Sequence, residues 1–356
     1  MKILVPILQF GKSGGYRVLS QLANTWISMG HEVIFMVPIA TIIPYFPTSA
    51  KIVWVDKSGN SCSEKMVVDE HNYSLWNRWT ALYKGMNKRS DGYDIILANH
   101  SLSTYPIIFS RIKGRKFYYI QAYEPEYYQA FKGVKNYLVS FISWFSYFLK
   151  FERIANADLY KHYKNIRATK VVYPGIDLDL FKPNNAVIKE KIVLGSIGRL
   201  EAYKGTSYVL DGFLIALKRN PNLELHVAFG DKSLEELHPA IKIITPQNDK
   251  ELSKFYNSLN AIIAAGTVQI GAIHYPVIEG MACNIPVITT GYYPATPINS
   301  WIVPIKDANA IAEQIFNVID DPIIRTQKIR KAYEAVAEFS WNIVANKMYN
   351  YFNGDC

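Results

Sequence analysis

The segment from residue 2 to residue 37 constrains the fold more than any other part of this sequence. Residues 2–8 form an apolar run of strand length, and residues 31–37 form a second one. Between them, a glycine-rich turn at residues 11–15 leads into residues 18–27, where apolar side chains recur at helical spacing. A strand, a helix and a second strand in this order form a βαβ unit, in which the two strands lie parallel in one sheet. We therefore expect an α/β protein.

The same alternation continues along the chain and begins again in its second half. Further strands are predicted at residues 51–55, 94–100, 116–120, 192–197, 223–229, 241–244, 261–265 and 286–290. A chain of 356 residues exceeds the size of one typical core. The Pro-Gly turn within residues 171–177 joins the two halves. We predict two Rossmann-like, doubly wound domains, at residues 1–172 and 173–340.

Charge and cysteine content narrow the classes of function. The chain has 39 Lys and Arg against 30 Asp and Glu, a net charge of +9. This favours an anionic partner such as a phosphorylated ligand or a membrane surface, and a merely soluble basic surface explains it equally well. Nucleic-acid binding is not predicted, because no recognition motif accompanies the charge. The three cysteines lack metal-site or disulfide spacing, which fits a reducing cytosol. We predict no signal peptide, no membrane span and no metal site.

Residues 275–290 combine a short helix with a buried strand. Pro276 suits the beginning of a helix, and Asn284 can adopt the left-handed conformation that ends one. Glu279 is expected in the first turn of this helix, among apolar neighbours. A buried carboxylate is unfavourable unless something binds it, although the helix N-terminus helps. Glu279 is therefore a candidate ligand-binding residue.

Two cations follow the strand at residues 192–197. Arg199 and Lys204 stand between the end of this strand and a helix whose apolar face begins at Tyr208. A planar guanidinium and a compact ammonium before a helix N-terminus suit a diphosphate. The alternative is a pair of isolated surface cations, which is the default elsewhere on a protein.

Three strand ends in the first half carry further candidates. Gly14 and Gly15 follow the first strand, where backbone amides could approach an anion, although such a turn is more often only a turn. His100 ends the predicted strand at 94–100, and ligands of open α/β sheets bind beyond such ends. A histidine satisfied by local backbone is an equal alternative. Glu124 follows the strand at 116–120; Pro125 biases it toward an extended conformation, and a solvated loop is the usual alternative.

Taken together, these motifs resemble family 4 glycosyltransferases. The run PVIEGMACNIPVI at residues 276–288 resembles the donor-site motif of that family, and the spacing from Gly198-Arg199 to Lys204-Gly205 matches its diphosphate clamp. The segment 14–18, the linker at 174–177 and the loop at 121–125, which is similar to rhamnosyltransferase-type members, agree in part. The resemblance extends over essentially the whole chain.

The resemblance implies a GT-B fold with a nucleotide sugar in an interdomain cleft, and a last helix at 341–356 that packs back on the first domain. It implies that Arg199 and Lys204 neutralise the diphosphate and Glu279 holds the ribose, beside His274 and Tyr275. His100 would assist at the sugar or phosphate, and Gly14 and Gly15 would shape the floor of the site. Glu124 is our candidate for orienting the acceptor hydroxyl. The reaction would retain anomeric configuration, without metal or cofactor.

The sequence departs from the family pattern upstream of Glu279. The family has a second glutamate eight positions earlier, where this chain has Gly271, and His274 stands where a glycine is common. The loop at residues 270–273 is apolar. An apolar wall would tolerate the methyl group of a 6-deoxy sugar, so we hypothesise L-rhamnose donated from dTDP-rhamnose.

Several functions remain open at this point. We predict transfer to a glycan or lipid-linked oligosaccharide in bacterial surface polysaccharide synthesis, of the O-antigen or capsule type. The alternatives are a hexosyltransferase using a UDP- or GDP-sugar, a catalytically weak donor-binding subunit of a glycan-assembly complex, and a phosphorylase or nucleotide-sugar epimerase of the same architecture.

Residues 134–152 are predicted as one helix rich in aromatic side chains, with lysines near both ends. A core helix is the simpler interpretation. The alternative is a helix in the membrane interface, with its aromatics toward lipid and its lysines toward phosphates. The expected location is cytoplasmic, at the inner face of the cell membrane if the second interpretation holds.

Overall fold

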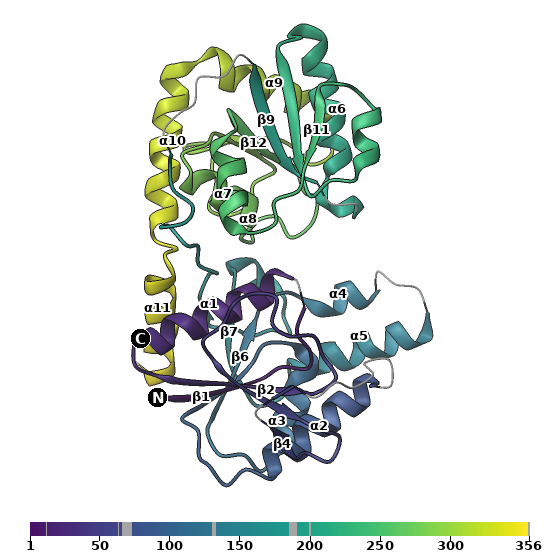
Figure 1. The fold of residues 1–356 in the computed structure, drawn as a ribbon, viewed down its shortest axis with the longest axis vertical. Coiled ribbons are helices and arrows are strands. Elements are labelled where there is room, and N and C mark those ends of the chain that lie inside the picture. The colour runs from purple at the N-terminus through teal and green to yellow at the C-terminus, as the bar shows by residue number, and fades with distance from the viewer. Residues whose placement is uncertain are drawn as a thin grey trace. The chain divides into compact units, whose positions relative to one another are not determined.

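The computed structural model describes residues 1–11, 13–62, 64–65, 73–129, 133–184, 191–198 and 201–354. The chain divides into two compact units (Figure 1). Unit 1 comprises Met1–Pro174 and Trp341–Cys356, and unit 2 comprises Gly175–Ser340. Each unit has a central sheet with helices on its faces, and the sheet is parallel apart from one strand pair of unit 1, as predicted for a Rossmann-like α/β chain.

The sheet of unit 1 has the strand order β4-β3-β2-β1-β5-β6-β7-β8. Every pair is parallel except β3 with β4. The strands are β1 (Lys2–Pro6), β2 (Glu32–Pro38), β3 (Lys51–Val55), β4 (Ser61–Cys62), β5 (Ile95–Ala98), β6 (Arg115–Ile120), β7 (Glu152–Ala155) and β8 (Lys170–Val171). The chain order reverses direction between β1 and β5, which is the switch point at which ligands of such sheets bind.

Helices of unit 1 include two that lie side by side, α1 (Gly14–Ser28) and α11 (Trp341–Asn353). The indole of Trp26, which is completely buried, donates a 3.2 Å hydrogen bond to the carbonyl of Ala345 and lies 5.6 Å from the ring of Phe352. The other helices are α2 (Leu75–Asn87), α3 (Thr104–Phe109), α4 (Glu124–Gln129) and α5 (Val134–Ser146), with the short 3₁₀ turns η2 (Ser101–Ser103) and η3 (Asp158–His162).

Unit 2 contains one sheet in the order β11-β10-β9-β12-β13-β14, with every pair parallel. The strands are β9 (Ile192–Ile197), β10 (Leu223–Ala228), β11 (Ile241–Ile244), β12 (Ala261–Ala264), β13 (Val287–Thr289) and β14 (Trp301–Ile302). The helices are α6 (Thr206–Arg219), α7 (Asp249–Asn257), α8 (Tyr275–Ala282), α9 (Ala308–Asp320) and α10 (Pro322–Ala337). Here the switch point lies between β9 and β12, so the loops after these two strands meet at one edge.

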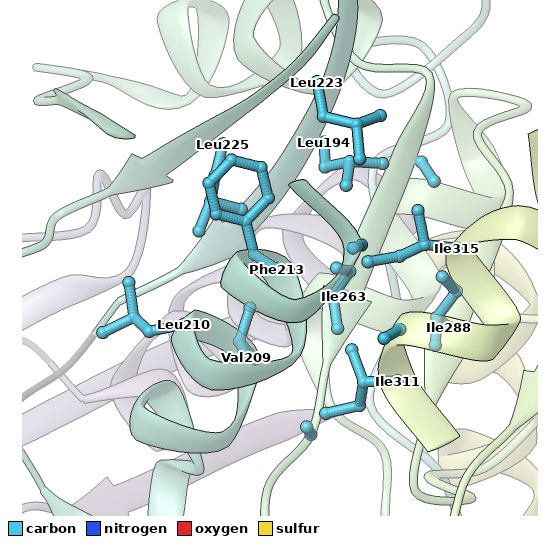
Figure 2. Packing of buried hydrophobic residues seen from close by; sticks show 14 of the residues in the cluster. Leu194, Val209, Leu210, Phe213, Leu223, Leu225, Ile263, Ile288, Ile311 and Ile315 are labelled. Carbon is cyan, nitrogen blue, oxygen red and sulfur yellow. The ribbon is translucent and has the colours of Figure 1, made fainter. Parts of the chain in front are cut away.

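The core of unit 2 fills the space between the sheet and the helices α6 and α9 (Figure 2). Phe213 from α6 and Ile315 from α9 are completely buried, and they pack toward Leu194 and Ile263 of the central strands. Burying an aromatic side chain of this size stabilises by roughly 2–3 kcal/mol relative to exposing it. The apolar side of α6 that was predicted from its spacing is therefore the side that holds it on the sheet.

Three local predictions were wrong. Gly14 and Gly15 do not belong to a turn before the first helix but are the first two residues of α1. The aromatic helix does not reach residue 152, because residues 152–155 form strand β7, which pairs with β6 and β8. Glu124 is not extended but is the first residue of α4, where Pro125 is tolerated in the first turn. Within the described ranges, no helix has the length and apolar character needed to cross a bilayer.

Candidate active site

The turn that carries Lys204 is held tightly at the switch point of unit 2. Lys204 ends the 3₁₀ turn η4 (Ala202–Lys204), and Gly205 follows as the N-cap of α6 with a φ of +74°. A Cβ atom on Gly205 would lie 1.9 Å from the carbonyl oxygen of Ala265, directly after β12. The amide of Thr267 donates a 2.9 Å hydrogen bond to the carbonyl of Tyr203. Only glycine fits this approach, and the turn is thereby fixed against the end of β12.

Lys204 is half-buried, and its Nζ lies 5.2 Å from the centre of the Tyr203 ring. Its position immediately before the N-terminus of α6 joins a side-chain cation to the positive end of a helix, and both attract anions. Arg199, the other predicted cation of this pair, lies outside the described residues.

The loop that follows β12 leads into the N-terminus of α8. His274 is its N-cap, and the imidazole packs against the ring of Tyr292 with the two ring centres 4.4 Å apart. Tyr275 is the first helical residue, and its hydroxyl donates a 3.4 Å hydrogen bond to the carbonyl of Gly175. The helix ends as predicted, with Asn284 in the left-handed conformation at a φ of +57°.

Glu279 is buried on α8, with 2% of its surface exposed. It is the fifth residue of the helix, so the prediction of a first-turn position was wrong, because α8 already begins at Tyr275. Its Oε2 accepts a 2.7 Å hydrogen bond from the hydroxyl of Tyr256 on α7. Burial, followed by the nearby Glu279 carboxylate, raises the pKa of the Cys283 thiol to about 12. Tyr256 thus orients a buried carboxylate, a partner that sequence patterns did not reveal.

Gly271 occupies the position of the glutamate that the family pattern would place upstream. Its φ is +93°, and a Cβ atom there would meet nothing within 4 Å. Space is therefore available, but the backbone adopts a conformation that L side chains rarely take. This chain therefore differs from the family pattern at position 271 in two ways: the carboxylate is absent, and the backbone conformation favours glycine.

The candidates of unit 1 converge at its own switch point. The side-chain amide of Gln121, directly after β6, donates a 3.4 Å hydrogen bond to the carbonyl of Gly15. Gly15 and the exposed Gly14 open α1, which follows β1. A Cβ atom on Gly15 would lie 3.3 Å from Gln121 Oε1, so the glycine permits this close packing of the loop after β6 on the helix.

His100 and Glu124 lie next to each other in unit 1. His100 Nδ1 is 3.9 Å from Glu124 Oε2, and it accepts a 3.1 Å hydrogen bond from the amide of Leu102. With Nδ1 an acceptor, the neutral ring carries its proton on Nε2, which lies 3.3 Å from the hydroxyl of Tyr128. Local backbone thus satisfies one nitrogen of His100, and the other faces the hydroxyl of Tyr128.

Glu124 is buried, with 8% of its surface exposed, in contrast to the solvated loop that Glu-Pro-Glu usually forms. Its Oε2 accepts a 2.6 Å hydrogen bond from the amide of Ser101. Burial and then the Glu124 charge raise the pKa of Tyr16 to about 12, against a lowering effect of Arg78. The same two causes raise the pKa of Tyr128. Both phenols stay protonated at neutral pH and can donate hydrogen bonds.

Sequence reasoning missed Tyr16 and Tyr128 as site residues. Tyr16 directly follows the glycine pair, and Tyr128 lies one helical turn after Glu124, so spacing could have indicated both. Two buried polar atoms, Asn99 Nδ2 and Gln121 Oε1, have no hydrogen-bond partner among the described residues. Because an unpaired buried polar atom is unfavourable, these two are candidates for contact with a ligand or water.

The second unit carries a match to a known family. Residues 191–321 match the family model described as glycosyl transferases group 1. This segment is therefore similar to glycosyl transferases group 1. It contains Lys204, His274, Tyr275 and Glu279, so the predicted donor-site residues of unit 2 all fall within the matched part.

Curated relatives of this chain are distant glycosyltransferases. D-inositol 3-phosphate glycosyltransferase from Saccharomonospora viridis is 24% identical over a stretch that covers 49% of this chain and 47% of that protein. The capsular polysaccharide biosynthesis glycosyltransferase CapM from Staphylococcus aureus is 26% identical, covering 50% of this chain and 52% of its own length. The chain thus spans about half the length of the curated relatives it matches.

Solved structures share the fold over nearly the whole chain. Sucrose-phosphate synthase from Thermosynechococcus elongatus matches with a TM-score of 0.78 at 16% identity, covering 99% of this chain and 98% of that chain. Anabaena HepE in complex with UDP-glucose matches with a TM-score of 0.72 at 16% identity, covering 99% and 100%. At this identity the likeness establishes the fold, two Rossmann-like domains with parallel sheets of the GT-B type.

Proposed function

We propose that this chain is a glycosyltransferase that moves a sugar from a nucleotide-sugar donor to a hydroxyl group of a glycan acceptor. The observation that carries the proposal is the Lys204–Gly205 turn, which the close approach of Gly205 to Ala265 fixes at the switch point of unit 2. A half-buried ammonium immediately before a long helix favours a diphosphate. In a site closed from water, stabilising the charge that develops on a leaving diphosphate accelerates transfer substantially.

The other candidates supply the remaining roles in this proposal. Glu279, oriented by Tyr256, holds the ribose, and His274 and Tyr275 form the adjoining helix end. Arg199 supplies the second cation of the diphosphate clamp. In unit 1, Glu124 orients the acceptor hydroxyl.

His100 assists at the sugar or the phosphate, and Gly14 and Gly15 shape the floor of the site in unit 1. By resemblance, the reaction retains anomeric configuration and uses neither a metal ion nor a cofactor. Unchanged turnover after exhaustive chelation would agree with metal independence.

The donor sugar we propose is L-rhamnose, from dTDP-rhamnose. The support is the loop at residues 270–273, whose side chains are apolar and half-buried or buried, and in which Gly271 brings no carboxylate to the sugar. An apolar wall tolerates a methyl group but leaves a hydroxyl without a partner. A hexosyltransferase is the second candidate, because Anabaena HepE, which shares the fold, is solved in complex with UDP-glucose.

The acceptor we propose is a glycan or a lipid-linked oligosaccharide of a bacterial surface polysaccharide, of the capsule or O-antigen type. The relative CapM, a capsular polysaccharide glycosyltransferase, supports this setting. We place the activity in the cytoplasm, because the three cysteines show no disulfide spacing. A catalytically weak donor-binding subunit would bind the nucleotide sugar without turnover.

Calorimetric titration with dTDP-rhamnose, UDP-glucose and GDP-mannose tests the donor. We expect selective binding of dTDP-rhamnose. Selective binding of UDP-glucose or GDP-mannose would contradict rhamnose as the donor sugar and indicate that hexose instead.

Lys204→Ala should weaken donor binding at least tenfold while the unfolding free energy changes little. Lys218→Ala, an exposed lysine at the far end of α6, is the matched control and should bind as wild type. If Lys204→Ala binds the nucleotide-sugar donor with wild-type affinity, Lys204 does not bind the diphosphate.

A further inference from the structure

Helix α5 of unit 1 exposes its aromatic side chains and buries its serines. Tyr137, Phe141 and Phe145 are 60%, 59% and 47% exposed, and Leu138, Trp144 and Phe148 are exposed beside them. Soluble proteins usually place the apolar side of such a helix in the core. In α5 the orientation is reversed, and several large apolar side chains on one helix need a partner of their own.

The serines explain why α5 lies this way. Ser140, Ser143 and Ser146 recur every three residues and are all at most 2% exposed. Ser140 Oγ donates a 3.0 Å hydrogen bond to the carbonyl of Pro125, and Ser143 Oγ donates a 2.8 Å hydrogen bond to Ser101 Oγ. Small hydroxyl side chains let the helix lie close to the α4 and η2 segments. Turning the aromatic side inward would break these bonds, so the outward aromatics belong to the folded state.

The exposed surface continues onto α2 and α3. Tyr105 Oη on α3 donates a 2.5 Å hydrogen bond to the carbonyl of Ile142 on α5, which ties the two helices together. The rings of Tyr105 and Phe109 lie 6.5 Å apart, and Phe109 lies 6.2 Å from Trp79 of α2. Trp76 stacks on Trp79 at 5.3 Å and is 70% exposed. We call the exposed side chains of α2, α3 and α5, with Phe148, the aromatic surface.

Together, the three helices of the aromatic surface carry cationic side chains but no acidic ones. The sequences of α2, α3 and α5 contain no Asp or Glu. Lys135 and Lys150 flank the aromatic stretch of α5 and are exposed, and Arg111 is exposed after α3. The guanidinium of Arg167 lies 5.8 Å from the centre of the Phe148 ring. The nearby Glu152 is already paired with Arg115 at 2.8 Å. Apolar rings bordered by cationic side chains complement a lipid bilayer, which has an apolar interior and can carry anionic headgroups.

We propose that the aromatic surface of unit 1 docks on an anionic lipid bilayer, with the rings of α5 and α2 at the level of the headgroups and Lys135 and Lys150 against lipid phosphates. Trp, Tyr and Phe are the side chains that suit this depth, because they combine large apolar area with a polar edge or a rigid ring. Each lysine or arginine near an anionic surface adds to the attraction. This partner does not depend on the proposed transferase activity, because it follows from the exposed side chains of α2, α3 and α5.

Co-sedimentation of the full chain with vesicles tests the proposal. We expect binding to vesicles that contain phosphatidylglycerol, weaker binding to phosphatidylcholine alone, and release by high salt. Phe141→Ser with Phe145→Ser should reduce the bound fraction at least tenfold. Ile298→Ser with Ile323→Ser removes two side chains of unit 2 that are each 70% exposed, and this control should bind as wild type. An unchanged circular dichroism spectrum and melting temperature establish that each variant is folded.

Two further results would overturn the proposal. Absence of wild-type binding to anionic vesicles is the first. The second is a concentration-dependent dimer that the Phe141 and Phe145 changes abolish while vesicle binding persists, which would assign the aromatic surface to a second copy of the chain. If the α5 variant unfolds, Trp76→Gln with Phe109→Ser provides the same test from α2 and α3, and it should lower vesicle binding as well.

Discussion

The hydroxyl of Tyr256 and the Oε2 atom of Glu279 are joined by a 2.7 Å hydrogen bond, and both side chains are buried. The bond connects α7 to α8, and it gives the carboxylate one fixed orientation. Removing one partner of a buried hydrogen bond costs about 1–3 kcal/mol of stability, and more where a charged group is involved.

The first prediction concerns this bond. Tyr256→Phe should lower the unfolding free energy by about 1–3 kcal/mol and should weaken nucleotide binding, because the carboxylate loses its orientation. Urea unfolding and nucleotide titration measure the two effects. Tyr333→Phe, at an exposed tyrosine of α10, is the control and should change neither. Wild-type affinity in Tyr256→Phe would contradict the orienting role.

Two glycines with positive φ make a matched pair for the second prediction. Gly205→Ala places a methyl group 1.9 Å from the Ala265 carbonyl, whereas Gly271→Ala places one in open space. The left-handed conformation alone costs roughly 1–2 kcal/mol, and only Gly205→Ala adds the clash. We therefore expect Gly205→Ala to lose substantially more unfolding free energy than Gly271→Ala in urea titrations. An equal loss would mean that the turn of Lys204 can move away from β12.

The third prediction separates the charge of Glu124 from its hydrogen bond. In Glu124→Gln the side-chain oxygen can still accept from the Ser101 amide, so the fold should persist. If Glu124 handles the acceptor hydroxyl, turnover should fall by roughly 10²–10⁴ while nucleotide affinity stays the same. Glu126→Gln, at the exposed carboxylate two residues further on, is the control.

A spectroscopic readout accompanies this test. Burial and the Glu124 charge raise the pKa of Tyr16 to about 12. The pKa of Tyr16 should therefore fall in Glu124→Gln, which a titration of labelled tyrosines by NMR would detect. A Tyr16 pKa that does not move would show that the two side chains are not electrostatically coupled.

The fourth prediction concerns pH and the carboxylate of Glu224 in unit 2. The hydrogen bond from Lys191 at 2.7 Å, opposed by burial and aided by Lys242 and His226, lowers the Glu224 pKa from 4.5 to about 2. A carboxylate whose pKa is lower in the folded state than in the unfolded state stabilises the fold at a pH above the unfolded-state pKa. This stabilisation is lost as the pH falls through the folded-state pKa. The unfolding free energy should thus decrease from pH 4.5 toward about 2, and the decrease should be shallower in Glu224→Gln. Equal slopes would assign the acid sensitivity to other carboxylates.

Periodicity along the sequence predicted the sheets well, because strand runs and helix faces are local patterns. The βαβ unit at residues 2–37 and the left-handed Asn284 follow from neighbours in the chain. Short strands such as β7 were missed, since Glu152–Ala155 is too short to show a period and is defined by its pairing with β6 and β8.

The environment of each candidate residue was less predictable, because it depends on distant segments. Glu124 is buried partly because Ser140 binds the carbonyl of Pro125, and nothing near Glu124 in the chain indicates this. Tyr256 could not be paired with Glu279 from spacing for the same reason. For α5, hydrophobicity alone favoured a core helix, and the three buried serines decided the opposite orientation.

Helix α11 has a consequence for the order in which the protein is made. Unit 1 begins at the first residue of the chain but includes Trp341–Asn353, which cover the indole of Trp26. The ribosome therefore synthesises all of unit 2 before it synthesises α11, the helix that completes unit 1. Until then Trp26 and its neighbours on α1 lack their cover, so unit 1 would be the last to become stable during synthesis, although its strands emerge first.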